Sequence, residues 1–211
     1  MKKGKIIVLL TLFGVLAVFF WGCGGSGPGL PGSSGSTDTG IIPTVTAVSH
    51  SDPSEDQGDV WEIDLFQDTC TGGTAEVWGN DFAHVTFHGE SLNPNVTSTN
   101  ELFVTNYTVT FFPTDPGLPP IEQMSFGSQT GIFVVADADS GPFPFLIFDT
   151  GRKITIQNQI GFPPGGGGTY PVSTPLLYNM KIQMWGQDKY GNSVTFSPIQ
   201  RVIDISDFDH C

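Results

Sequence analysis

The sequence predicts an all-β domain, folded as an antiparallel β-sandwich. Gly and Pro, 27 and 16 of the 211 residues, interrupt the chain every few positions, so no long stretch keeps the 3.6-residue period of a helix. Short segments instead alternate apolar and polar residues, which is the period of a strand with one buried face. Turn-forming residues separate these segments, as they do in sandwiches, although a barrel would show the same pattern.

The alternation is clearest over residues 178–185, YNMKIQMW, where every second residue from Tyr178 to Met184 is apolar. One face of this strand is expected to enter a core. The other face, which carries Lys181, Gln183 and Trp185, is expected to point outward. The remaining expected strands are residues 43–48, 61–65, 81–87, 104–112, 121–126, 132–136, 143–148, 152–157, 193–198 and 201–206.

Residues 185–192, WGQDKYGN, predict a turn between two of these strands. The D-x-x-G-N pattern resembles a hairpin turn near the end of bacterial immunoglobulin-like and fibronectin-III-like domains, in which Gly191 and Asn192 would tolerate positive φ. The resemblance covers residues 178–203 and implies an immunoglobulin-like sandwich, but no activity. Pro- and Gly-rich loop insertions at residues 113–120 and 161–175 explain why the domain exceeds the ~100 residues of a simple sandwich.

The N-terminus predicts export. Three lysines within the first five residues precede an uncharged stretch at residues 6–21, which suits a signal helix and is shorter than the ~20 residues of a membrane-spanning helix. Gly22 and Cys23 follow, and the whole resembles a bacterial lipoprotein signal. The resemblance implies cleavage after residue 22 and acylation of Cys23, with palmitate among the acyl chains. An uncleaved membrane anchor is the alternative.

The domain plan follows from this N-terminus. Residues 1–22 are the expected signal peptide, residues 23–40 the lipid anchor and a Gly/Ser-rich tether, and residues 41–211 the sandwich. As a flexible coil the tether would span roughly 20–25 Å. We expect the domain to be held at the cell envelope, on the periplasmic or the surface face of the outer membrane.

Three cysteines are an odd number for an exported protein. Assigning Cys23 to lipid leaves Cys70 and Cys211 as an even pair in an oxidising compartment, which predicts a disulfide bond between them. Two unpaired thiols are the alternative. Such a bond would close a long loop and contribute ~4–5 kcal/mol in the chain-entropy model.

The charge of the chain limits its partners. The full sequence has 21 acidic and 8 basic residues and a net charge of −13, and loss of the three signal lysines leaves about −16. A surface of this sign repels phosphate backbones, so nucleic acid is not an expected partner. The expected partners are the lipid membrane, through Cys23, and an envelope protein or glycan.

The segment FLIFDTG at residues 145–151 resembles the Asp-Thr-Gly loop that follows an apolar strand in aspartic proteases. The resemblance implies a catalytic Asp149, but that chemistry needs two carboxylates that share one proton. The second Asp-Thr-Gly, at residues 38–40, lies in the tether. We therefore expect a turn between strands 143–148 and 152–157 and no catalytic residue, with a hydrolase that uses Asp149 as the alternative.

Calcium is the one cofactor that the sequence leaves open. Asp137 and Asp139, in the segment DADSG, are candidate ligands because Ca²⁺ prefers carboxylate and carbonyl oxygens. The acidic loop at residues 52–59 is a second candidate. His84 and His88 would share one face of a strand but lie ~13 Å apart, which is too far for one ion.

An outward aromatic residue provides the candidate ligand-binding position. Trp185 could stack on a sugar ring or contact a partner protein, unless another layer covers it. His50 and His210 lie in acidic segments and are expected in solvent. The sequence thus predicts a non-catalytic structural or ligand-binding module, with a carbohydrate- or calcium-binding adhesion domain as the alternative.

Overall fold

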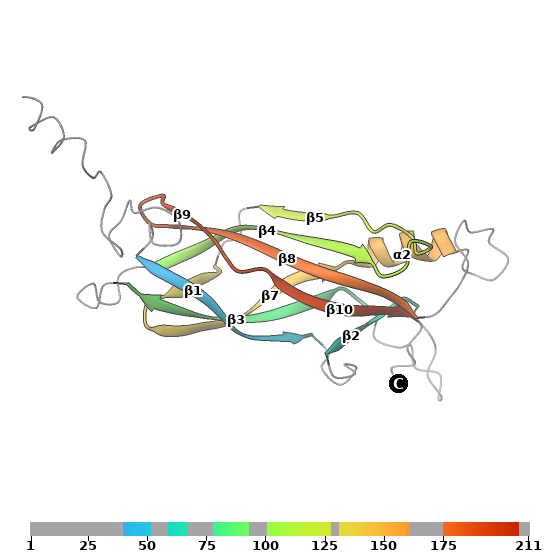
Figure 1. Cartoon of the computed structure of the whole chain (residues 1–211), viewed down its shortest axis with the longest axis horizontal. Coiled ribbons are helices and arrows are strands. Elements are labelled where there is room, and N and C mark those ends of the chain that lie inside the picture. Colours follow the sequence, from blue (N-terminus) through green and yellow to red (C-terminus); the bar gives the residue numbers. More distant parts are fainter. Residues whose placement is uncertain are drawn as a thin grey trace, which may run out of the picture.

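The computed structural model describes residues 40–51, 59–66, 78–92, 101–127, 131–160 and 175–206. In this part of the chain two β-sheets pack face to face in a sandwich-like arrangement, and one helix lies at one end of them (Figure 1). Each segment that was expected to be a strand overlaps an observed one, apart from residues 152–157.

The smaller sheet has three antiparallel strands in the order β1-β3-β7. They are β1 (Ile41–His50), β3 (Asp81–Ser91) and β7 (Ala138–Phe148). Buried and less buried residues alternate along β3, where Val85 and Phe87 are fully buried. This alternation is the predicted pattern of a strand with one face on the core.

The larger sheet has seven strands. Five follow the order β2-β10-β8-β4-β5, while β6 pairs with β4 and β9 pairs with β8. Their bounds are β2 (Val60–Asp64), β4 (Glu101–Pro113), β5 (Met124–Gly127), β6 (Phe133–Val135), β8 (Leu176–Asp188), β9 (Ser193–Thr195) and β10 (Ile199–Ser206).

Aromatic side chains join the two sheets. The ring of Tyr107 on β4 meets the ring of Phe145 on β7 edge-on, with 4.9 Å between centroids. Phe111 on β4 and Phe148 on β7 make a similar contact at 5.5 Å. Each buried aromatic side chain contributes about 1.5–3 kcal/mol through the apolar surface it removes from water. These contacts pack β4, an interior strand of the larger sheet, against β7, an edge strand of the smaller one.

The prediction of purely antiparallel sheets was wrong at one place. β2 runs parallel to β10, with Trp61 opposite Ile203 and Ile63 opposite Ile205. Alternation along a strand shows which side chains are buried, but it is the same whichever way the neighbouring strand runs. The direction of β2 relative to β10 therefore could not be predicted from the residues of β2 alone.

The prediction of a strand at residues 152–157 was also wrong. Helix α2 (Thr150–Ile160) occupies this segment, and it buries Lys153, Ile156 and Ile160. Their spacing of three and four residues is that of one helix face. The alternation of Ile154 and Ile156 suggested a strand, but Ile154 is exposed and the apolar face continues at Ile160.

The turn predicted at residues 188–192 is present between β8 and β9. The Asp188 carboxylate accepts hydrogen bonds from the backbone N–H groups of Tyr190 (2.8 Å) and Asn192 (2.9 Å), and from the side-chain amide of Asn192 (2.9 Å). Gly191 has a φ of 86°, a conformation that glycine adopts without steric cost. Local side-chain bonding of this kind explains why the sequence predicted the turn correctly.

Several predictions lie outside the described residues. They concern the signal helix, the acylated Cys23, the Cys70–Cys211 disulfide and most of the second loop insertion, residues 161–174. Within the described ranges, no helix is long and apolar enough to cross a membrane.

Candidate functional site

Asp149 caps helix α2. One carboxylate oxygen, Oδ1, accepts the backbone N–H of Arg152 at 2.9 Å, and the other contacts the Arg152 guanidinium. The backbone carbonyl of Asp149 accepts the N–H of Lys153 at 3.1 Å, which is the first hydrogen bond of the helix. The prediction of a turn between two strands is therefore wrong, since Asp149 lies between the end of β7 and the start of a helix. The contacts of its carboxylate are those of a structural residue.

Replacing Asp149 with alanine is expected to lower the free energy of unfolding by about 1–2 kcal/mol, because the N–H of Arg152 loses its side-chain acceptor and the guanidinium loses its carboxylate partner. Asp149→Asn is the matched control, since asparagine is an equally good helix cap, and it should cost less than about 0.5 kcal/mol. Urea denaturation measures both. Equal losses in the two variants would contradict a capping role.

Asp137 and Asp139 already have protein partners in the structure. The Asp137 carboxylate accepts the backbone N–H of Ser91 at 3.0 Å, and Asp137 itself has a φ of 56°. Asp139 contacts Nδ1 of His88 at 2.8 Å, on the exterior of the sheet. The described residues contain no group of three or more His, Cys, Asp or Glu that could hold a metal ion. Calcium binding at Asp137 and Asp139 stays a prediction, and most of the acidic loop at 52–59 lies outside the described residues.

A buried charged cluster lies where β1, β3 and α2 meet. Nζ of Lys153 is 3.2 Å from Oδ2 of Asp81, and the Lys153 side chain is 2% exposed. The ammonium also lies 5.6 Å from the centre of the Trp78 ring. Burial raises the pKa of Asp81, while the charge of Lys153 opposes that shift. The pair joins helix α2 to the start of β3.

His50 belongs to the same cluster, so the expectation that it lies in solvent was wrong. It is 1% exposed, and its ring stacks on Trp61 with 5.4 Å between centroids. Its Nε2 lies 3.9 Å from Oδ1 of Asp81. His50 is the last residue of β1. Its burial could not be predicted from the acidic sequence around it, because a local pattern does not show which parts of the chain cover a residue.

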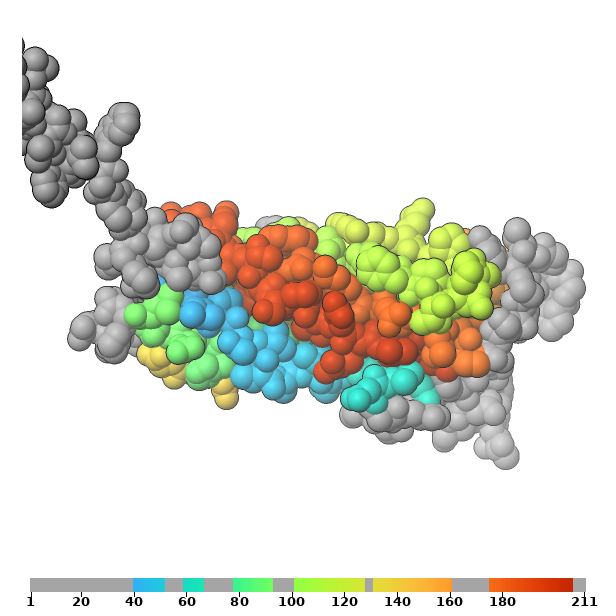
Figure 2. Space-filling model, in the orientation of Figure 1, coloured from blue at the N-terminus to red at the C-terminus, as the bar shows by residue number. Residues whose placement is uncertain are grey.

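The outer face of the larger sheet carries a hollow lined by several polar side chains. A hollow of about 590 Å³ lies over β4, β8 and β10. We call it the outer-face groove, and the residues that line it include Asp59, Phe112, Asn179, Lys181, Gln200 and Arg201. Figure 2 shows atoms of β8 and β10 exposed along this side of the molecule.

Strand pairing places the groove residues in two adjacent rows. Asn179 on β8 lies between Phe112 on β4 and Val202 on β10. Lys181 lies in the next row, between Thr110 and Gln200. Directly opposed residues on one face have Cβ atoms about 4.5–5.5 Å apart, so these side chains form one contiguous surface.

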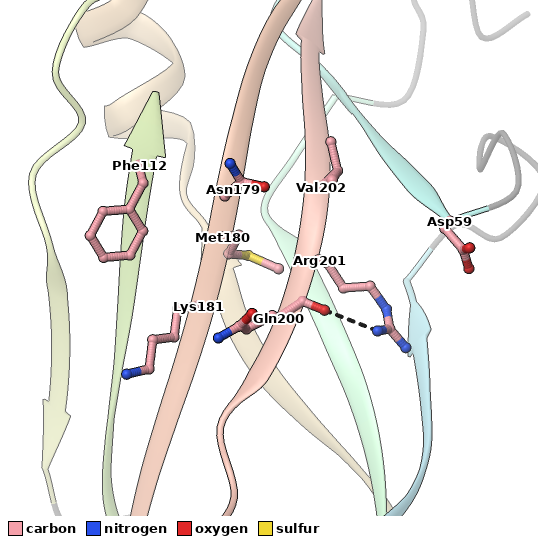
Figure 3. A pocket seen from close by; sticks show the side chains of 8 residues that line it. All are labelled: Asp59, Phe112, Asn179, Met180, Lys181, Gln200, Arg201 and Val202. Atoms are coloured by element: carbon pink, nitrogen blue, oxygen red, sulfur yellow. Dashed lines mark hydrogen bonds between the residues drawn. The ribbon is translucent and has the colours of Figure 1, made fainter. Parts of the chain in front are cut away.

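The close view in Figure 3 shows how the side chains lie. Phe112 and Lys181 both extend over β4, and Asn179 and Gln200 lie beside them on β8 and β10. Phe112 is 50% exposed. Arg201 extends to the other side of β10, and its guanidinium lies 5.7 Å from the centre of the buried Trp61 ring. On the outer face the hollow is thus lined by an aromatic ring, two amides and the ammonium of Lys181.

Trp185 lies on the same face of β8 as Lys181, as the alternation predicted, and it is half-buried. Its strand neighbours are Asn106 and Thr195. A second hollow, of about 300 Å³, is lined by these three residues among others. The role of Trp185 in ligand binding stays a prediction.

Comparison with known proteins identifies no relative: no family model, curated protein or solved structure matches the chain. The site is therefore judged on its own geometry. Sequence reasoning named Trp185 but missed Phe112, Gln200 and Arg201. The signal for Phe112 was present, because Phe111 and Phe112 are adjacent in a strand and only one of two adjacent side chains can face the core.

Proposed function

We propose that this chain is a lipid-anchored protein of the cell envelope whose immunoglobulin-like sandwich binds a ligand in the outer-face groove, without catalysis. The observation that supports binding is the exposed ring of Phe112 beside Lys181, Asn179 and Gln200. A solvated face of a sheet is usually covered by charged and small polar residues. Ligand sites combine aromatic or apolar surface with a few polar groups that fix orientation, and Phe112 with its polar neighbours offers both.

The anchor and the envelope location rest on the N-terminal sequence. The basic start, the apolar stretch and Cys23 together fit a lipoprotein signal, and the tether of residues 24–40 would separate the domain from the lipid headgroups. The immunoglobulin-like assignment is supported by the two packed sheets and by the turn at Asp188. In this proposal a Cys70–Cys211 bond ties the end of the chain to its early part, and Asp149 has no catalytic role.

The test uses the full chain, extracted from membranes in detergent, where the mass of the mature N-terminus reports acylation of Cys23. The protein is screened against arrays of glycans and of peptides. The double variant Phe112→Ala/Lys181→Met is expected to weaken binding of the captured ligand by about a hundredfold, at about tenfold for each lost contact.

The control is His84→Ala, a change on β3 in the smaller sheet. It should leave binding unchanged, and the melting temperatures of all variants should show that they are folded. If every array ligand binds the double variant as well as the parent protein, the outer-face groove is not a binding site and the proposal is wrong.

A further inference from the structure

We propose that the outer-face groove binds an acidic saccharide, with the carboxylate of a uronic acid on Lys181, a sugar ring against Phe112, and hydroxyl groups on Asn179 and Gln200. This inference rests on the proposed function and specifies the chemical class of the ligand. Three features of the described residues support it: the distribution of basic side chains, the chemistry of the two rows, and the length of the polar face.

Basic residues are scarce in this protein, and one of them, Lys181, lies on the outer face of the groove. Five basic residues follow Cys23 in the sequence: Arg152, Lys153, Lys181, Lys189 and Arg201. Arg152 pairs with Asp149, and Lys153 pairs with Asp81. Lys181 forms no ion pair with a carboxylate of the described residues and lies on the outer face of the groove. Arg201 lies opposite the buried Met180, on the other face of β10, and its guanidinium lies over Trp61. An anionic ligand would therefore find the free ammonium of Lys181 here, on a chain that is acidic overall.

The neutral residues of the rows match a ligand that is rich in hydroxyl groups. Side-chain amides both donate and accept hydrogen bonds. Asn179 and Gln200 present such amides from two adjacent strands, β8 and β10. The hydroxyl of Thr110 lies in the row of Lys181. The C–H face of a pyranose ring can pack against the exposed ring of Phe112, which removes apolar surface of both from water. A sugar presents both kinds of surface within one ring.

The polar face is long enough for several sugar units. Along β8, Asn179 and Trp185 are six residues apart on the same face, which corresponds to about 20 Å. Gln183 lies between them on this face, and the hollow at Trp185 lies at the far end. An aromatic ring thus stands near each end of a row of polar side chains.

An acidic peptide fits the site less well. Peptides often bind sheets by adding a strand to a free edge, where backbone groups are unpaired. At the groove, β8 is paired with β4 on one side and with β10 on the other, so its backbone groups are already hydrogen-bonded. Recognition must come from side chains alone, which favours a ligand whose own polar groups are hydroxyls and carboxylates.

The experiment measures binding of a short oligogalacturonate to the full-length protein in detergent by isothermal titration calorimetry. The matched ligand is the same oligomer with its carboxyl groups reduced to alcohols. We expect the acidic oligomer to bind about tenfold more tightly than the reduced one at low salt, as for one charge-assisted hydrogen bond. The difference should shrink as ionic strength rises.

Two lysine variants locate the carboxylate. Lys181→Met should weaken binding of the acidic oligomer about tenfold and leave the reduced oligomer unchanged, because one charged contact is lost. Lys189→Met, in the turn after β8, is the control and should change neither. Phe112→Ala should weaken both oligomers by a similar factor, since the ring contacts carbons rather than the carboxylate.

Three results would overturn the inference. The first is equal binding of the acidic and reduced oligomers, and the second is binding that Lys181→Met does not alter. The third is preference for a poly-glutamate peptide of equal charge over the oligouronate. If that peptide loses affinity in Lys181→Met, the proposed function stands and only the ligand class is wrong. If no ligand of any class depends on the groove, both fail.

Discussion

Replacing Lys153 with methionine is expected to lower the free energy of unfolding by about 3–5 kcal/mol at neutral pH. The substitution removes the ammonium that lies 3.2 Å from the Asp81 carboxylate and keeps most of the apolar volume of the side chain. Asp81 is 13% exposed, so its negative charge would remain in a poorly solvated position without its main partner. Guanidinium chloride denaturation of the full-length protein measures the loss.

The loss should depend on pH, because burial raises the pKa of Asp81 above its ordinary value of 3.8. A carboxyl group whose pKa is higher in the folded chain favours folding fully below pH 3.8, and that contribution is lost as the pH rises through the folded-state pKa. In Lys153→Met the opposing influence of the ammonium is absent, so the pKa of Asp81 rises further. The deficit of the variant should therefore shrink as the pH is lowered toward 4.

Two further variants separate the buried pair from a general effect on helix α2. Arg152→Met removes the neighbouring cation, whose partner Asp149 is 28% exposed, and should cost about 0–1 kcal/mol. The double variant Asp81→Asn/Lys153→Met should recover much of the stability, because neither charge remains buried. If Lys153→Met and Arg152→Met cost the same, the cluster contributes no more than a surface ion pair.

The expected strands show how much of the fold local chemistry determines. Along β8 the apolar residues from Tyr178 to Met184 are buried, and Lys181 and Trp185 share the other face. The turn at Asp188 was predictable because its hydrogen bonds form within five consecutive residues. Both features depend on residues that are close together in the sequence, so apolar alternation and turn-forming residues are enough to predict them.

The features that were missed depend on partners distant in the sequence. The burial of Lys153 follows from its pairing with Asp81 on another strand, which the local sequence does not show. Helix α2 was read as a strand because a short apolar alternation fits both periods until Ile160 is included. The outer-face groove needs the pairing of β4, β8 and β10, which places Phe112 beside Asn179 and Lys181 beside Gln200. No local pattern specifies which strands are neighbours.

Gly89 marks a close approach between the two sheets, and replacing it with alanine is expected to cost about 2–3 kcal/mol. A Cβ atom at this position would lie 2.3 Å from the carbonyl oxygen of Val135 and 3.1 Å from Cγ2 of Ile41. The nearer atom belongs to the backbone, so no side-chain rotation can relieve the overlap. Val135 ends β6 in the larger sheet, whereas Gly89 lies in β3 of the smaller one.

The overlap would also disrupt a hydrogen bond between β3 and the segment that joins β6 to β7. The N–H of Asp137 donates to the carbonyl of Gly89 at 2.6 Å, just where the chain passes from β6 into β7. Gly127→Ala is the matched control: Gly127 is also a strand residue, in β5, and a Cβ atom there meets nothing within 4 Å. Thermal unfolding should show a change within about 0.5 kcal/mol for Gly127→Ala. Equal stability of the two variants would contradict the close contact between β6 and β3. Only that contact makes alanine destabilising at Gly89 and neutral at Gly127.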